Sequence, residues 1–222
     1  MVAASLSNVI PMSRHGVKRT VPASSSVALL ALMALAAAPL GAGADDLLAA
    51  CADCHGIALA GEQATGAPNL TVLPSWYVER QLQNYLRGLR GEAGGAGTSD
   101  AHALDGDGIA AATALAASLP ARTAAPTLDG DAERGSSLYR TCATCHGELG
   151  QGNQAFNAPP LAGQNDWYLV QQLEHYQAGR RGGVPGDIWG AQMRASTAVL
   201  GDEDAMRDVV AYISTFKPDG AP

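Results

Sequence analysis

The sequence is short of cysteine, of cationic side chains and of long apolar runs. Its four cysteines all lie in two short motifs, so none is left over for a disulfide. Fourteen Lys and Arg against 21 Asp and Glu give a formal charge of −7, which argues against nucleic acid as a partner. The acidity either favours protein partners with a basic docking patch or only keeps the protein soluble. The apolar run at 27–40 is too short to span a bilayer comfortably.

The N-terminal segment lacks acidic residues. Three basic residues precede the apolar run, no Asp or Glu occurs before Asp45, and the small-x-small tripeptide Ala42-Gly43-Ala44 follows the run. This order is typical of a secretory signal, so we predict that residues 1–44 are removed on export, with Met12 as an alternative start. Removal would take the formal charge to −10. The alternative is an uncleaved segment that tethers the protein to the membrane.

The cysteines form two CxxCH pentapeptides. They are Cys51-Ala52-Asp53-Cys54-His55 and Cys142-Ala143-Thr144-Cys145-His146. At this spacing two thiols can form thioethers to one haem, and the histidine that follows can ligate its iron. A thioredoxin-type dithiol needs a strand-rich βαβ setting, and a structural zinc site needs four ligands that converge. The two motifs therefore predict two covalently bound haem c groups.

The second half of the chain repeats the first. An offset of 91 residues aligns the two motifs and then the pairs Pro68/Pro159, Leu70/Leu161, Trp76/Trp167, Tyr77/Tyr168, Gln81/Gln172, Tyr85/Tyr176 and Arg90/Arg181. Self-similarity at a fixed offset indicates a duplicated domain. We predict one copy at 45–120 and another at 131–222, joined by a Pro/Ala/Thr linker at 121–130.

Each copy is predicted to be all-α, wrapped around one covalent haem. The first helices are expected at 45–50 and 131–141, and a Gly/Pro/Asn-rich irregular loop follows each CxxCH. Middle helices should begin at the N-caps Ser75 and Asp166, and last helices should cover 108–119 and 202–216. A loop before each last helix is expected to carry the second iron ligand.

The second iron ligands are predicted to differ between the copies. In the second copy Met193 is the candidate, because Met206 falls in the apolar face of a helix. The first copy has no methionine after His55, and the offset of 91 places His102 where the second copy has Met193. We therefore predict His55 with His102 at the first iron and His146 with Met193 at the second. The alternative is an open first iron, since the first copy is about six residues shorter after His102.

Four further side chains are candidates for contacts with haem propionates. They are Trp76, Trp167, Arg90 and Arg181, which flank the two middle helices. An indole N–H or a guanidinium could donate hydrogen bonds to a propionate and so tune the potential. Ordinary packing and a cation at a helix C-terminus are the alternative.

These motifs make the chain resemble the two-haem class I cytochromes c of the cytochrome c4 type over about residues 45–217. The second copy carries most of the resemblance, in Leu138-Tyr139, Cys142 to Gly147, Ala158-Pro159, Leu161 to Gln164, Trp167-Tyr168, Gln172-Leu173, Gly179 to Gly182 and Gln192-Met193-Arg194. The resemblance implies the all-α cytochrome c fold, a periplasmic location and one-electron transfer between respiratory partners. His102 departs from the family's methionine, and an imidazole in this place lowers a haem potential, so electrons should run from the first haem to the second.

The main hypothesis is an electron carrier that is not itself an enzyme. Its donor would be a quinol-oxidising complex or a dehydrogenase, and its acceptor a terminal oxidase or another cytochrome. The alternative is an electron-transfer subunit or catalytic cytochrome of a periplasmic dehydrogenase or sulfur-compound oxidising enzyme, with an open first haem. A haem-based sensor would need an output domain, for which the chain leaves no room.

Overall fold

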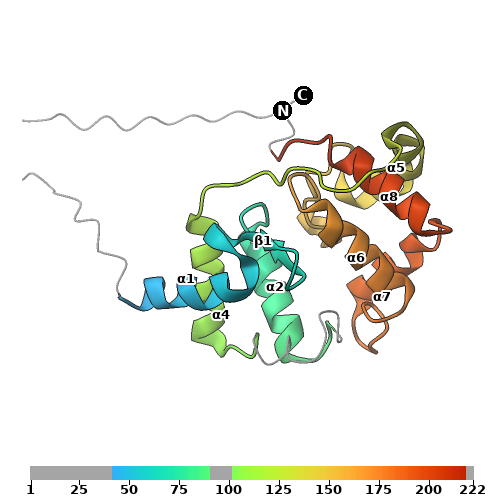
Figure 1. Cartoon of the computed structure of the whole chain (residues 1–222). Coiled ribbons are helices and arrows are strands. Elements are labelled where there is room, and N and C mark those ends of the chain that lie inside the picture. The colour runs from blue at the N-terminus through green and yellow to red at the C-terminus, as the bar shows by residue number, and fades with distance from the viewer. Residues whose placement is uncertain (1–41, 91–101, 219–222) are drawn as a thin grey trace, which may run out of the picture. The chain divides into compact units, whose positions relative to one another are not determined.

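The computed structural model describes residues 42–90 and 102–218, and within them the chain is mostly helical (Figure 1). The first copy contains α1 (Ala42–His55), α2 (Ser75–Leu86) and α4 (Gly106–Ser118). The second contains α5 (Ala132–His146), α6 (Asp166–Gln177), α7 (Ile188–Thr197) and α8 (Glu203–Ile213). No helix of the described residues is long and apolar enough to cross a membrane. The predicted signal covers residues 1–44, and positions 1–41 of it lie outside the described residues.

Each first helix runs through its whole CxxCH motif, beyond the predicted ends. In α5 the Asp131 carboxylate caps the start by accepting from the backbone N–H groups of Glu133 and Arg134, at 3.0 Å each. The helix ends at His146 because Gly147 follows with φ of 82°, a left-handed conformation that glycine adopts without strain. In α1, Gly56 does the same with φ of 72°. Both cysteines and the histidine of a motif are therefore held on one rigid helix.

The segment after the first motif contains a short hairpin that the sequence did not predict. Strand β1 (Ala60–Glu62) pairs antiparallel with β2 (Ala67–Asn69), in the register Ala60 to Asn69 and Glu62 to Ala67. The second copy has only a bridge between Asn153 and Ala158, which are the repeat counterparts of Glu62 and Ala67. The same register thus shapes both loops, although too few residues pair for an alternating apolar pattern to mark them.

The predicted N-caps of the middle helices were each wrong by one residue. Helix α2 is capped by Pro74, whose φ of −70° and ψ of 150° are extended, and Ser75 is already helical. Helix α6 is capped by Asn165, and Asp166 is its first residue. The Asp166 carboxylate does not cap the helix in the predicted way, because it turns to accept hydrogen bonds from the linker.

The loop predicted to carry Met193 is a helix. In α7 the Asp187 carboxylate accepts from the Gly190 N–H at 2.9 Å and so caps the start. Ala191, Gln192, Met193 and Arg194 then follow, and all four have high helix propensity. At the offset of 91 residues the corresponding segment of the first copy is 97–106, and its first half, 97–101, lies outside the described residues.

The last helices close the two cores. Helix α8 crosses α5 so closely that a Cβ on Gly135 would lie 1.9 Å from the carbonyl oxygen of Asp208. The core of the second copy includes Tyr139, Leu173, Met206, Val209, Val210, Ile213 and Phe216. In the first copy α4 packs on α2 around a smaller core of Val78, Leu82, Ile109 and Ala116.

The linker at 121–130 is extended and is hydrogen-bonded to both copies. On one side the Arg122 N–H donates to Thr71 Oγ1 at 2.9 Å. On the other, the Ala124 N–H donates to the Gly163 carbonyl at 3.0 Å, and Asp166 accepts from Thr127 and Leu128.

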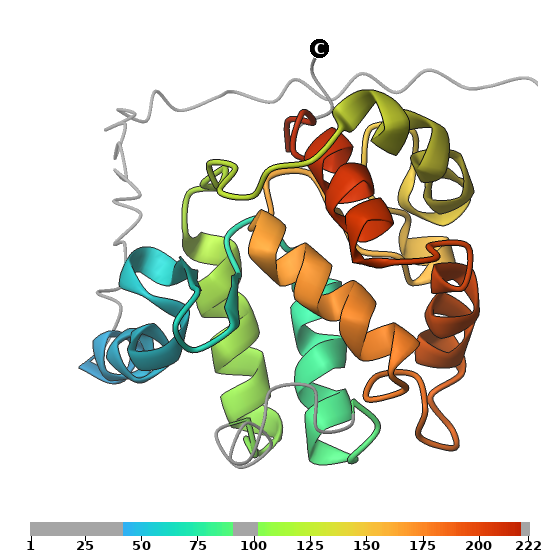
Figure 2. The ribbon, with the colours of Figure 1, turned by 45° about the vertical axis from the view of Figure 1, so that its right-hand side comes forward.

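Helices α2 and α6 lie next to each other in both views (Figure 2). Hydrogen bonds between Arg90 and Tyr168 and between Arg181 and Gln81 join these parts of the two copies.

Candidate functional site

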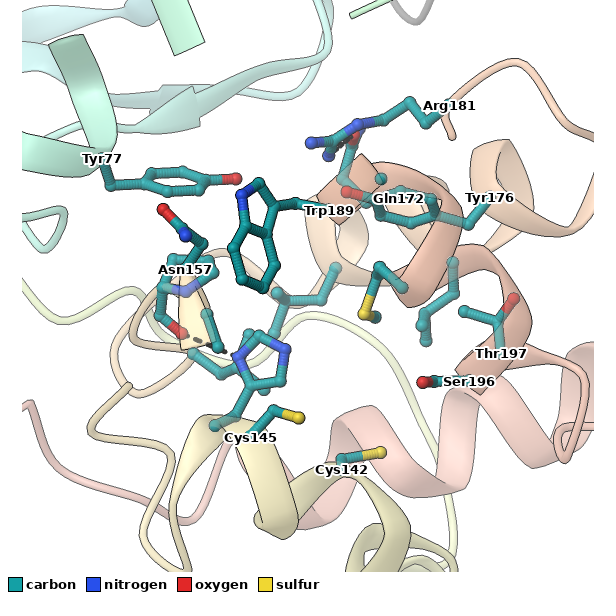
Figure 3. A pocket seen from close by; sticks show the side chains of 18 of the residues that line it. Tyr77, Cys142, Cys145, Asn157, Gln172, Tyr176, Arg181, Trp189, Ser196 and Thr197 are labelled. Carbon is teal, nitrogen blue, oxygen red and sulfur yellow. Dashed lines mark hydrogen bonds between the residues drawn. The ribbon is translucent and has the colours of Figure 1, made fainter. Parts of the chain in front are cut away.

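Each copy has a cavity at its CxxCH motif. The first has a volume of about 450 Å³, and its walls include Cys51, Cys54, His55 and His102. The second has a volume of about 150 Å³, and its walls include Cys142, Cys145, His146 and Met193 (Figure 3). The structure therefore gathers each predicted set of cysteines and axial ligands around one cavity.

The two motif histidines are held in the same way. His55 and His146 are buried, with 7% and 6% of their surfaces exposed. Nδ1 of His55 donates to the Pro68 carbonyl at 2.9 Å, and Nδ1 of His146 donates to the Pro159 carbonyl at 2.8 Å. Since a carbonyl can only accept, each ring carries its proton on Nδ1, and Nε2 keeps a free lone pair for a metal. Burial lowers the pKa of both rings, although the bond to the proline carbonyl acts the other way.

His102 lines the first cavity, although it lies far from His55 in the sequence. It comes three residues before Asp105, which caps α4 by accepting from the Gly108 N–H at 2.8 Å. Its ring stacks on Tyr85 with centroids 4.4 Å apart and planes 11° apart. The ring centroids of His102 and His55 are 6.2 Å apart, with an angle of 85° between the planes. Two imidazoles thus face one cavity.

Met193 and Met206 occupy different environments. Met193 lies on α7, lines the second cavity and packs partly buried against the core. Met206 lies on α8, is 4% exposed within the hydrophobic core of the second copy, and does not line the cavity. A thioether at the cavity wall is a soft ligand suited to haem iron, whereas one in the core fills space.

The two cavities share a wall made by both copies. Six residues line both: Leu73, Tyr77, Gln81, Arg90, Tyr168 and Gln172. Four of them are repeat counterparts, Tyr77 of Tyr168 and Gln81 of Gln172. Groups bound in the two cavities would therefore lie close to each other.

Two buried guanidinium groups lie at this wall. Arg90 and Arg181 are 6% and 7% exposed. Arg90 donates to Gln81 and, at 2.9 Å, to the Tyr168 hydroxyl. Arg181 donates to Gln172 at 2.7 Å and to Gln81 at 3.4 Å. Each arginine therefore bonds the glutamine nine residues before it, and both reach Gln81.

These arginines test whether the cavities fit haem. The ion pairs found among residues 42–90 and 102–218 include neither guanidinium, and Arg90 Nε has no hydrogen-bond partner there. A buried cation without an anion is costly. Haem carboxylates would supply the missing negative charge, and the thiols and Nε2 atoms would supply attachment and ligation. The residues present therefore fit a haem in each cavity.

The structure does not bring Trp76 and Trp167 to either cavity. The tyrosine after each of them, Tyr77 or Tyr168, lines both cavities, because one residue along a helix turns the side chain by about 100°. The sequence held a signal for these tyrosines, since Tyr77, Gln81 and Tyr85, like Tyr168, Gln172 and Tyr176, recur every four residues on one helix face. Trp189, which was not predicted, lines the second cavity and is 42% exposed (Figure 3).

Burial shapes the titration of other groups around the cavities. The pKa of the Cys142 thiol is raised to about 11, chiefly by burial, so the free thiol is protonated at neutral pH. The pKa of His175 is lowered to about 4 by burial and by Arg180, Arg181 and Arg90, which keeps this ring neutral near the arginines.

Comparison with known proteins agrees with this architecture. The family model for cytochrome c matches residues 132–217. The thiosulfate dehydrogenase electron acceptor of Stutzerimonas stutzeri (strain A1501) is 30% identical over 183 residues, which are 78% of this chain and 81% of that protein.

Two solved structures extend the comparison. The thiosulfate dehydrogenase TsdBA from Marichromatium purpuratum is 32% identical with a TM-score of 0.62, over 76% of this chain but only 36% of that longer chain. Cytochrome c4 from Acidithiobacillus ferrooxidans is 26% identical with a TM-score of 0.59, over 76% of this chain and 99% of that one. The predicted helical fold and the two haem c groups are confirmed. The chain belongs to the dihaem class I cytochromes c, the family of cytochrome c4, and is an electron carrier with two covalently bound haem c groups.

Proposed function

We propose that this cytochrome is the electron acceptor of a sulfur-compound dehydrogenase of the thiosulfate dehydrogenase type. The observation that carries the proposal is a match over both copies to a protein named as such an acceptor. A solved thiosulfate dehydrogenase contains a part that resembles this chain and makes up 36% of its length.

The first iron is proposed to be held by His55 and His102. A metal ion about 2 Å from one nitrogen of each imidazole would fit between the two rings, whose centroids are 6.2 Å apart. The Tyr85 ring, stacked on His102, would fix the imidazole plane. Cys51 and Cys54 would form the thioethers.

The second iron is proposed to be held by His146 and Met193, with thioethers to Cys142 and Cys145. The haem groups supply one-electron oxidation and reduction in both sites. Arg90 and Arg181 would bind their propionates at the shared wall, where both guanidiniums are buried and residues 42–90 and 102–218 offer neither of them a carboxylate partner. This arrangement keeps the propionates out of water and holds the two redox groups close together.

The direction of electron flow follows from the ligands. An imidazole in place of a thioether lowers a haem potential, so the first copy would be the weaker oxidant. The protein would accept electrons from the dehydrogenase at its first copy and deliver them from its second to a cytochrome or oxidase. We propose that it works in the periplasm after export by residues 1–44, since haem c is attached outside the cytoplasm.

Rapid mixing tests the proposed donor. Oxidised, haem-loaded protein is mixed with thiosulfate and a purified thiosulfate dehydrogenase that lacks an acceptor domain, and haem absorption is followed. Reduction should need both enzyme and thiosulfate, and it should slow as salt screens the charge of this acidic chain. Reduction no faster than that of a cytochrome c4 under the same conditions would instead favour a general carrier.

A further inference from the structure

Arg80 belongs to the first copy but lies at the cavity of the second. It is on α2 and lines the cavity that contains Cys142, Cys145 and His146. It does not line the cavity of its own copy. The repeat counterpart of Arg80 is Gln171, which carries no charge. The two copies therefore differ by one cation at this position.

The Arg80 side chain is fixed, yet part of its hydrogen-bonding capacity is unused. Nη2 donates to the Asn157 carbonyl at 2.8 Å, and the guanidinium lies over the rings of Trp76 and Tyr77, 5.4 Å and 5.1 Å from their centroids. Nε and Nη1 are buried and have no hydrogen-bond partner within the described residues. Burial lowers the pKa of Arg80, and Tyr77, Tyr176 and Asp187 act against this, but no ion pair with a carboxylate is found for it in 42–90 and 102–218.

The contact that Arg80 makes is one half of a reciprocal pair. Asn157, which accepts its hydrogen bond, is the repeat counterpart of Gly66. On the other side, a Cβ built on Gly66 would lie 3.1 Å from Nε2 of Gln171, and Gly66 lines the first cavity. Each middle helix thus reaches the haem loop of the other copy, but only the first copy reaches across with a charge.

We propose that Arg80 binds a carboxylate of the haem in the second copy through Nε or Nη1 and raises the reduction potential of that haem. Two buried donors beside the cavity need an anion, and haem carboxylates are the anions that the site would hold. A ferric haem carries one more positive charge than a ferrous haem, so a fixed cation nearby favours the ferrous state. Gln171 supplies no such charge to the first copy.

Exchange of the two side chains tests this inference. Arg80→Gln installs the residue that its counterpart carries, and Gln171→Arg does the reverse. Arg87→Gln is the matched control, because Arg87 is an exposed cation at the end of the same helix and lines neither cavity. Each haem-loaded variant is titrated with reductant. The charge-transfer band from the thioether to ferric iron reports the oxidation state of the second haem. If Arg80→Gln loses haem, Arg80→Lys, which keeps the charge, is titrated in its place.

Arg80→Gln should lower the ratio of reduced second haem to reduced first haem about tenfold at equilibrium, which is about 59 mV for one electron. Arg87→Gln should leave the ratio unchanged, Gln171→Arg should lower it by raising the first potential, and Arg80→Lys should stay near wild type. An equal effect of Arg80→Gln and Arg87→Gln, or no effect of either, would overturn the inference. The thioether band rests on the proposed Met193 ligand, and its absence from the wild type would be a failure of that proposal alone. No dehydrogenase is involved, so the proposed donor does not affect the result.

Discussion

Replacement of Asp166 by alanine should loosen the linker that holds the two copies in place. The carboxylate is 2% exposed at the start of α6. It accepts from the Thr127 hydroxyl at 2.8 Å, from the Thr127 N–H and from the Leu128 N–H at 2.7 Å. It also accepts from the Trp167 N–H at 2.7 Å. One carboxylate thus accepts hydrogen bonds both from the end of the linker and from the first turn of the helix.

The size of the effect follows from these bonds. A hydrogen bond to a charged group contributes about 1.5–3 kcal/mol, but Thr127 is exposed, and water would replace the carboxylate at its two donors. Mainly the two bonds to Leu128 and Trp167 are then lost, so Asp166→Ala should lower the free energy of unfolding by about 3–6 kcal/mol. For a chain of this size the melting temperature should fall by roughly 6–24 °C.

The stability that Asp166 contributes should depend on pH in one direction. Burial alone would raise the pKa of this carboxyl, but the hydrogen bonds from Thr127, Leu128 and Trp167 outweigh burial and lower it. A group whose pKa is lower in the folded state stabilises the protein above its unfolded pKa, near 3.9. The contribution is then lost as the pH falls through the folded pKa. The difference between wild type and Asp166→Ala should be constant from about pH 5 to 7 and shrink below about pH 4.

Guanidinium unfolding of the haem-loaded proteins, followed by circular dichroism, measures these differences. Asp107→Ala is the control, because Asp107 is an exposed acid in the first turn of α4. A loss below about 1 kcal/mol for Asp166→Ala, or a loss equal to that of the control, would refute the reasoning. A difference that grows as the pH falls below 4 would refute the assigned sign.

Two further predictions concern the first iron and the crossing of α5 with α8. His102→Ala should open the first iron, giving a high-spin paramagnetic signal and new affinity of the reduced protein for carbon monoxide, while Met193→Ala should do so at the second. Wild-type protein that already binds carbon monoxide in its first copy would contradict this. Gly135→Ala should cost about 1–3 kcal/mol in thermal unfolding, since its Cβ would lie 1.9 Å from the Asp208 oxygen. Gly106→Ala, with no atom of the described residues within 4 Å of its Cβ, should be nearly neutral, and equal melting temperatures for the two would exclude the steric cause.

The haem motifs were predictable because their signal is local, but the first helices were expected to end at 50 and 141, before the motifs that they in fact contain. Cys142, Cys145 and His146 lie within five residues, so about one and a half turns of helix fix their relation, and the glycine after them marks the end of the helix. The helix at Met193 was missed because the second iron ligand was expected on a loop before the last helix. The Asp187 cap, which starts the helix, is visible only once the backbone N–H of Gly190 is placed beside it.

The wall between the cavities could be predicted only in part. Arg90 and Arg181 were found because the repeat aligns them, but their partners lie on two helices whose contact is a tertiary property. Tyr168 bonds Arg90 across 78 residues, a distance at which sequence spacing carries no geometric information. The choice between Trp76 and Tyr77 depended on which face of α2 meets the other copy, and that was settled by packing.

The duplication itself explains why the differences between the copies matter. Two identical sites in contact would have similar potentials, and an electron would divide between them with no preferred direction. Here the offset of 91 residues grows to 97 between the caps Asp105 and Asp202, so His102 lies three positions before its cap where Met193 lies nine positions before the other. A lower first potential from His102 and a higher second potential from Arg80 would act in the same direction. If both roles hold, restoring symmetry at His102 alone should leave a difference in potential that only Arg80→Gln removes.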